Sequence, residues 1–121
     1  MSDELRNRRV AVLAADGVEQ IELEQTRQAT EQAGAQVDLV SVHSGEIQAM
    51  NQDINPGHRF NVDRELSQVS SGDYDALLLP GGTINPDTLR GDPRAVEFVR
   101  QFVTSGKPRR DLPRPVDARG S

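Results

Sequence analysis

The most constraining feature of the sequence is segment 75–82, a short apolar run that ends in a proline and two glycines. No polar residue interrupts Ala76–Leu79, and Pro80, Gly81 and Gly82 follow at once. A run of this kind is typical of a strand buried on both faces of a parallel sheet. Ligands of open α/β sheets bind beyond the carboxyl ends of the strands. We therefore expect Gly81 and Gly82 at a functional edge, where glycine lets backbone amides approach a ligand closely.

A strand, a helix and a second strand are predicted ahead of this segment. Val10–Ala15 is another unbroken apolar run and predicts the first strand. Residues 18–33 are rich in Glu, Gln and Ala, which favour a helix, and Gly34 is a typical helix stop. Val37–Val42 predicts the next strand. Together these segments form a β-α-β unit with a right-handed crossover, so we expect a parallel sheet.

The middle of the chain changes character. Between Ser44 and Asp63, turn-forming residues surround short segments at Ile47–Met50 and Arg59–Val62, which predicts a small hairpin excursion. A short helical piece is expected near Glu65–Val69, before the chain enters the apolar run described first.

The last clear element is a helix, and the residues after it do not continue the pattern. Asp92 and Pro93 form a typical helix start, and the apolar periodicity that follows ends before Gly106. Residues 109–121 contain four arginines, two aspartates and two prolines. Because buried charge is costly and proline breaks a strand ladder, we expect a disordered basic tail there. One α/β domain is therefore expected over residues 1–108.

Composition excludes several classes of function. A formal net charge of −5 argues against a nucleic-acid partner, and the absence of cysteine excludes disulfides, thiolate metal sites and thiol catalysis. His43 and His58 are isolated in polar stretches, so we expect surface roles and neither a metal nor a cofactor. No apolar run is long enough to span a bilayer, and Met1–Glu4 does not resemble a signal peptide. We expect a cytoplasmic protein without membrane contact.

Five segments together carry a resemblance to a known family: Ala15–Leu23, Ser44–Gln48, Val62–Arg64, Asp73–Gly82 and Asp92–Val96. Through them, residues 10–108 resemble the first part of the ThiJ/PfpI family, in its PfpI-like branch. The resemblance implies a class I glutamine amidotransferase-like fold, of which this chain is expected to hold the N-terminal part of a doubly wound, mostly parallel, flavodoxin-like sheet. We expect the chain to lack the nucleophile-elbow strand and the C-terminal part of that fold.

The resemblance also implies a chemistry. Members of the family are cysteine hydrolases, with peptidase, protein deglycase and glyoxalase-like activities linked to stress responses, and they commonly form homo-oligomers. Their cysteine lies on a strand-to-helix elbow just after a Gly-Lys-Pro, here 106–108. A carboxylate that corresponds to Glu22 faces it, and the amides of Gly81 and Gly82 help bind an oxyanion. This sequence lacks the cysteine and the histidine that follows it, so we expect no turnover.

Alternatives remain open at this point. From the residues alone, Glu22 can be a solvated helix residue, and Gly81 and Gly82 can form a simple turn. A different class of function is a small binding or interaction module that uses the diglycine loop or pairs through an exposed edge of strand Ala76–Leu79.

The tail suggests why the elbow is missing. Read one base later, possible codons of the thirteen residues after Pro108 encode Val-Ala-Ile-Cys-His-Gly-Pro-Trp-Thr-Leu-Val-Glu-Ala, which resembles a typical elbow of the family. The third, wobble base of each printed codon becomes the middle base of a shifted codon, and the printed residue does not fix it. The printed residues therefore permit this reading without requiring it. We interpret residues 109–121 as a frameshift product and the family domain as truncated after Pro108.

Overall fold

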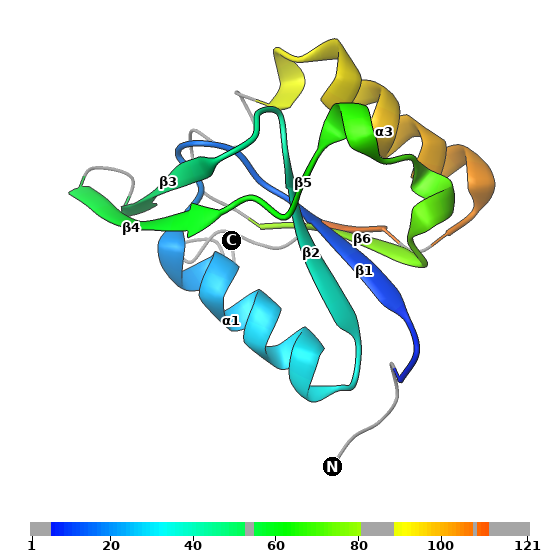
Figure 1. The fold of residues 1–121 in the computed structure, drawn as a ribbon, viewed down its shortest axis with the longest axis horizontal. Coiled ribbons are helices and arrows are strands. Elements are labelled where there is room, and N and C mark those ends of the chain that lie inside the picture. The colour runs from blue at the N-terminus through cyan, green and yellow to red at the C-terminus, as the bar shows by residue number, and fades with distance from the viewer. Residues whose placement is uncertain (1–5, 53–54, 81–88, 108, 112–121) are drawn as a thin grey trace, which may run out of the picture.

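The computed structural model describes residues 6–52, 55–80, 89–107 and 109–111 of the chain. They form one parallel five-stranded sheet, with a helix on each face, and a two-stranded antiparallel hairpin beside it (Figure 1). The mostly parallel α/β sheet and the hairpin excursion predicted from the sequence are both confirmed. None of the helices in these described ranges is long and apolar enough to cross a membrane.

The sheet is built outward from its central strand, β1 (Arg9–Leu13). The strand order is β5-β2-β1-β6-β7, and every neighbouring pair is parallel. β2 (Gln36–Ser41) and β5 (Arg64–Glu65) lie on one side of β1, and β6 (Ala76–Leu79) lies on the other. The chain therefore reverses its direction of growth between β1 and β6, as in a doubly wound sheet.

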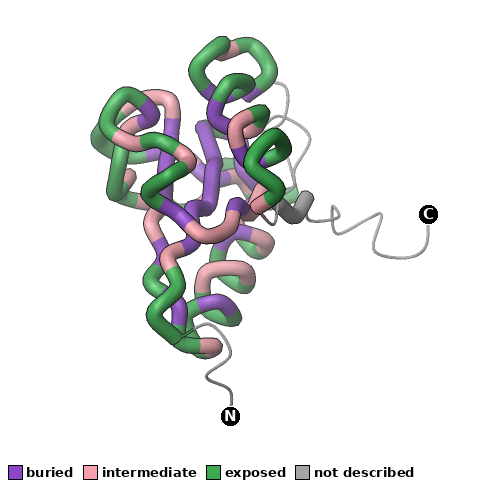
Figure 2. The backbone as a smooth tube through the Cα atoms, turned by 90° about the vertical axis from the view of Figure 1, so that its right-hand side faces the viewer, coloured by how far each residue is buried: buried purple, intermediate pink, exposed green. Residues whose placement is uncertain are grey.

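The two long helices cover opposite faces of this sheet (Figure 1). α1 is Gln20–Gln32 and α3 is Pro93–Ser105. Val10 and Val12 of β1 belong to the core cluster on the α1 side, whereas the alternate residues Ala11 and Leu13 belong to the cluster on the α3 side. This alternation follows from strand geometry, and Figure 2 shows the buried chain concentrated in the central strands.

Burial of β6 is less complete than the sequence suggests. Leu77 is fully buried, but Ala76, Leu78 and Leu79 are half-buried. Leu77 and Leu79 pack in the cluster on the α3 side, and Ala76 and Leu78 against the one on the α1 side. Both faces are thus covered, though more thinly than at β1, because β6 lies next to the last strand of the sheet.

The hairpin consists of β3 (Glu46–Asn51) and β4 (Asn55–Asn61). Two backbone hydrogen bonds join β3 to the turn after β1: Gly17 N–H donates to the Gln48 carbonyl at 2.9 Å, and Met50 N–H donates to the Val18 carbonyl at 2.8 Å. The hairpin is therefore tied to the segment that leads from β1 into α1.

Two short 3-10 helices connect the hairpin region to β6. The first, η1 (Leu66–Gln68), falls within the helical piece predicted near 65–69, and the second, η2 (Ser71–Asp73), follows it.

The tail departs from the prediction at its first three residues. Arg109–Asp111 form a short strand, β7, which pairs in parallel with Leu77–Leu79. The prediction of disorder from Arg109, and of an exposed edge along β6, is wrong for these residues. An edge strand needs backbone hydrogen bonds on one side only and tolerates charge, and both tail prolines come after Asp111. The rest of the predicted tail, 112–121, lies outside the described residues.

Candidate functional site

The topology of the sheet points to the carboxyl ends of β1 and β6. The direction of growth reverses between these two strands, and ligands of such sheets bind at this switch point, beyond the carboxyl ends. β1 ends at Leu13 and continues through a turn into α1, and β6 ends at Leu79. Because β1 and β6 are parallel neighbours, their last residues lie at one edge of the sheet, here called the carboxyl edge.

Glu22 belongs to the first turn of α1, at the carboxyl edge. The residue is half-buried, and its Oε2 atom is shielded from solvent. A carboxylate in this position interacts favourably with the amino-terminal end of the helix dipole. The structure therefore places Glu22 where the switch point lies and does not leave it as a fully solvated helix residue.

Gly81 and Gly82, the other predicted site residues, lie outside the described residues. Pro80, immediately before them, is buried after the end of β6.

The start of α1 is fixed by a contact that the sequence did not suggest. Glu19 precedes the helix, and its carboxylate accepts the backbone N–H of Gln52 at 2.8 Å. The side chain is buried, and an isolated bridge pairs Glu19 with Met50 of β3. The hairpin thereby holds the amino-terminal end of the helix that carries Glu22.

A second contact missed by sequence reasoning joins His43 to Asp16. His43 Nε2 lies 2.9 Å from Asp16 Oδ2, and its Nδ1 lies 2.9 Å from the Ser44 carbonyl oxygen. These acceptors, Ser44 first and then Asp16, raise the pKa of His43. The two residues follow the neighbouring parallel strands β1 and β2, which is the only feature of the sequence that could have brought them together.

The third contact at this edge involves α3. Arg94 donates from Nη2 to the Val42 carbonyl at 2.8 Å and pairs with Asp92 at 3.0 Å. Asp92 also accepts the backbone N–H of Arg94, as the predicted helix cap. The hydrogen bond from Arg94 holds the pKa of the Asp92 carboxyl below its ordinary value. The segment after β2 is thus tied both to the turn after β1 and to the start of α3.

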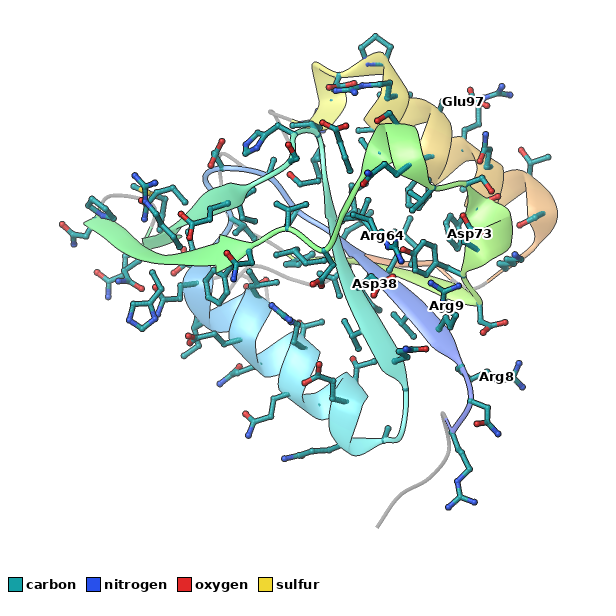
Figure 3. The ribbon with its side chains drawn as sticks, viewed as in Figure 1. Arg8, Arg9, Asp38, Arg64, Asp73 and Glu97 are labelled. Atoms are coloured by element: carbon teal, nitrogen blue, oxygen red, sulfur yellow. The ribbon has the colours of Figure 1, made fainter. Side chains whose placement is uncertain are left out.

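The opposite ends of the strands carry a polar cluster of a different kind. Tyr74 is 2% exposed and donates its hydroxyl to Asp38 Oδ2 at 2.8 Å, and the guanidinium of Arg9 lies 5.1 Å from its ring centroid. Burial first, and then the bond to Asp38, raise the pKa of Tyr74, so the phenol stays neutral. Figure 3 shows Arg9, Asp38 and Arg64 near one another. The cluster joins β1 and β2 to the residue pair that precedes β6.

The chemistry available at the carboxyl edge is that of a positioned carboxylate. A carboxyl group can hydrogen-bond to a thiolate beside it and tune its reactivity, but this sequence contains no cysteine. Within the described ranges, no three His, Cys, Asp or Glu side chains gather in a group that could hold a metal ion. His58 instead belongs to β4 of the hairpin, and its Nδ1 lies 3.7 Å from Oε2 of Glu24 in α1.

Comparison with known proteins agrees with this architecture. The sequence model of the DJ-1/PfpI family matches residues 8–109. The chain is 37% identical over 103 residues to "Putative cysteine protease YraA" of Bacillus subtilis, covering 84% of this chain and 57% of that protein. It is 35% identical over 103 residues to "Protein/nucleic acid deglycase 2" of Escherichia coli, with the same two coverages. "General stress protein 18" of Bacillus subtilis is 33% identical over 101 residues, covering 84% and 56%.

Solved structures show the same fold. A two-domain protein of Anabaena variabilis, with DJ-1/ThiJ/PfpI-like and ferritin-like domains, superposes with a TM-score of 0.77 at 25% identity, covering 87% of this chain and 29% of that one. DJ-1beta of Drosophila melanogaster gives a TM-score of 0.75 at 20% identity, covering 92% and 55%. The chain spans little more than half the length of the curated relatives described above.

Proposed function

Because this chain belongs to the DJ-1/PfpI family, we propose that it presents the first part of a cysteine hydrolase domain of the protease and deglycase kind. We further propose that the polypeptide of these 121 residues has no hydrolase turnover of its own. The observation that carries the proposal is the family match over residues 8–109 in a sequence without cysteine.

Glu22 is the carboxylate that faces the nucleophile position in this proposal. Three observations support the role. Glu22 lies at the switch point of the sheet, its Oε2 atom is shielded from solvent, and the turn before it is held by the contact between Glu19 and Gln52. A carboxylate held in this way is positioned to hydrogen-bond to a group presented at the carboxyl edge.

Gly81 and Gly82 are the oxyanion donors in this proposal. In the sequence they follow β6 and Pro80, and β6 pairs with β1, the strand that leads to Glu22. Backbone amides near the place where negative charge develops stabilise a tetrahedral intermediate, and removal of one such donor typically costs about 100-fold or more in turnover.

The missing part is the nucleophile. Thiolate chemistry needs a cysteine, and neither a carboxylate nor backbone amides replace it. β7 lies beside β6, where the strand that leads to the elbow is expected, but it contains Arg109, Arg110 and Asp111. In the shifted reading described above, the family cysteine falls on position 112, which is Leu112 in this chain.

A cysteine placed at that position tests the role of Glu22. In a Leu112→Cys variant the rate of thiol alkylation is measured against pH, and the midpoint gives the thiol pKa. We expect the midpoint to move when Glu22→Ala is added, because a carboxyl group within hydrogen-bond distance changes the thiol pKa. Glu31→Ala, on an exposed position of the same helix, is the control and leaves the midpoint unchanged. Identical midpoints with and without Glu22 would overturn the assignment.

A further inference from the structure

His43 is held between two acceptors at the carboxyl edge. Its Nε2 faces Asp16 Oδ2 at 2.9 Å, and its Nδ1 faces the Ser44 carbonyl oxygen at 2.9 Å. A carbonyl and a carboxylate oxygen only accept hydrogen bonds, and a neutral imidazole has a single N–H. Only the protonated ring can donate to both. Because both nitrogens are engaged, His43 is not placed to act as a general base.

Asp16 extends the contact to the hairpin. Its Oδ1 accepts the backbone N–H of Gln48 at 2.7 Å, while its Oδ2 faces His43. The Gln48 carbonyl in turn accepts the N–H of Gly17 at 2.9 Å. One carboxylate therefore joins three segments: the turn after β1, the segment after β2, and β3.

We propose that His43 is a pH-dependent clamp. In its protonated form it holds the Asp16 turn to the segment after β2, and when it deprotonates it loses one of the two hydrogen bonds. The helix that carries Glu22 begins four residues after Asp16, so the clamp acts on the segment that leads into the carboxyl edge. The proposal does not depend on the role given to Glu22.

The charges around His43 favour its protonated form. The Ser44 carbonyl, Asp16 and, more weakly, Glu65 all raise the pKa of His43 above 6.5, while partial burial lowers it. Arg94, which approaches the Val42 carbonyl from α3, is paired with Asp92. The stabilisation is therefore present below pH 6.5 and is lost as the pH rises through the raised pKa.

An NMR titration that follows the imidazole protons of His43 against pH tests the clamp directly. The full chain has two histidines, so a His58→Gln background leaves a single imidazole to follow. In this background we expect a His43 pKa above 6.5, and Asp16→Asn lowers it toward that value. As a control, Glu31→Ala, at an exposed position of α1, leaves the His43 pKa unchanged in the same background. A His43 pKa that is the same with and without the Asp16 charge would overturn the proposal.

Hydrogen exchange at Gln48 supplies a second readout that does not require the Asp16 variant to fold. The exchange rate of the Gln48 amide is compared between wild type and His43→Gln at the same pH. We expect several-fold faster exchange in the variant at about pH 5.5, and a smaller ratio at a pH well above the His43 pKa, where the neutral ring keeps only one of the two hydrogen bonds. An equal ratio at both pH values would contradict a protonation-dependent clamp.

Discussion

The carboxylate of Glu19 accepts the backbone N–H of Gln52 at 2.8 Å across 33 positions of sequence. Glu19 is only 5% exposed, whereas Gln52 is an exposed residue, so this hydrogen bond is partly buried. It holds the hairpin against the start of α1 and thereby positions the turn that carries Glu22. An acidic residue that the sequence places among solvated neighbours is thus an anchor of the candidate site.

Replacing Glu19 is expected to destabilise the protein. Glu19→Ala removes the acceptor of the Gln52 N–H, and the loss of a partly buried hydrogen bond costs about 0.5–1.5 kcal/mol. The free energy of unfolding is measured by denaturant titration. Glu31→Ala, at an exposed position of the same helix, is the matched control and should change stability by less than about 0.5 kcal/mol. Equal effects of the two substitutions would show that the contact does not anchor the hairpin.

A side chain at Gly57 is expected to cost some stability, because a Cβ there meets Oε1 at the far end of the Gln20 side chain, which must move aside. That oxygen accepts the backbone N–H of His58 at 2.6 Å, so moving it aside loses the hydrogen bond. Gly57→Ala should cost about 1 kcal/mol of unfolding free energy.

A double-mutant cycle identifies the cause of this cost. Combined with Gln20→Ala, the Gly57→Ala substitution should cost less, because the obstructing oxygen has been removed. Gly72→Ala is the control, since its nearest neighbour, Ser70 Oγ, would lie 3.6 Å from the new Cβ. Strict additivity of the two substitutions would argue against the collision.

Adjacent residues of α3 should differ sharply in their effect on stability. Phe102 is fully buried, and its ring meets that of Phe98 at 5.3 Å between centroids, whereas Val103 is 57% exposed. Phe102→Ala should cost about 3–5 kcal/mol through lost burial and a cavity. Val103→Ala should change the unfolding free energy by less than about 0.5 kcal/mol. Thermal or denaturant unfolding measures both, and similar losses would contradict the packing of α3 on the sheet.

The frameshift interpretation makes a prediction about the gene. We expect that, when the gene is read one base later from the end of the Pro108 codon, the fourth shifted codon encodes Cys and the fifth encodes His, as in the elbow described above. Nucleotide sequencing across this codon checks it. An uninterrupted frame, with no elbow encoded in any frame downstream, would remove the interpretation and leave β7 as a feature of this chain alone.

Local patterns predicted most of the sheet and both long helices. β1 and β6 follow from unbroken apolar runs, and α3 follows from its Asp92 cap, its apolar spacing and Gly106. Each of these elements is determined by a pattern of residues that lie close together in the sequence. The diglycine prediction at Gly81 and Gly82 lies outside the described residues.

Contacts between distant segments were not predictable in the same way. The pairing of Asp16 with His43 depends on the register of β1 against β2, and that of Glu19 with Gln52 depends on how the hairpin folds back. β7 was not predicted, because charged residues and prolines do not fit a central strand and an edge position was not considered. At the edge, backbone pairing with β6 suffices.

Turnover by the 121-residue polypeptide is the most direct test of the account. A preparation whose mass matches the sequence is assayed with a peptide substrate and with a glycated protein substrate, beside a heat-denatured sample of the same protein. The account predicts no turnover above the denatured sample, because the carboxylate of Glu22 has no thiol to act with. Turnover that persists in the mass-verified protein and falls in a Glu22→Ala variant would contradict it.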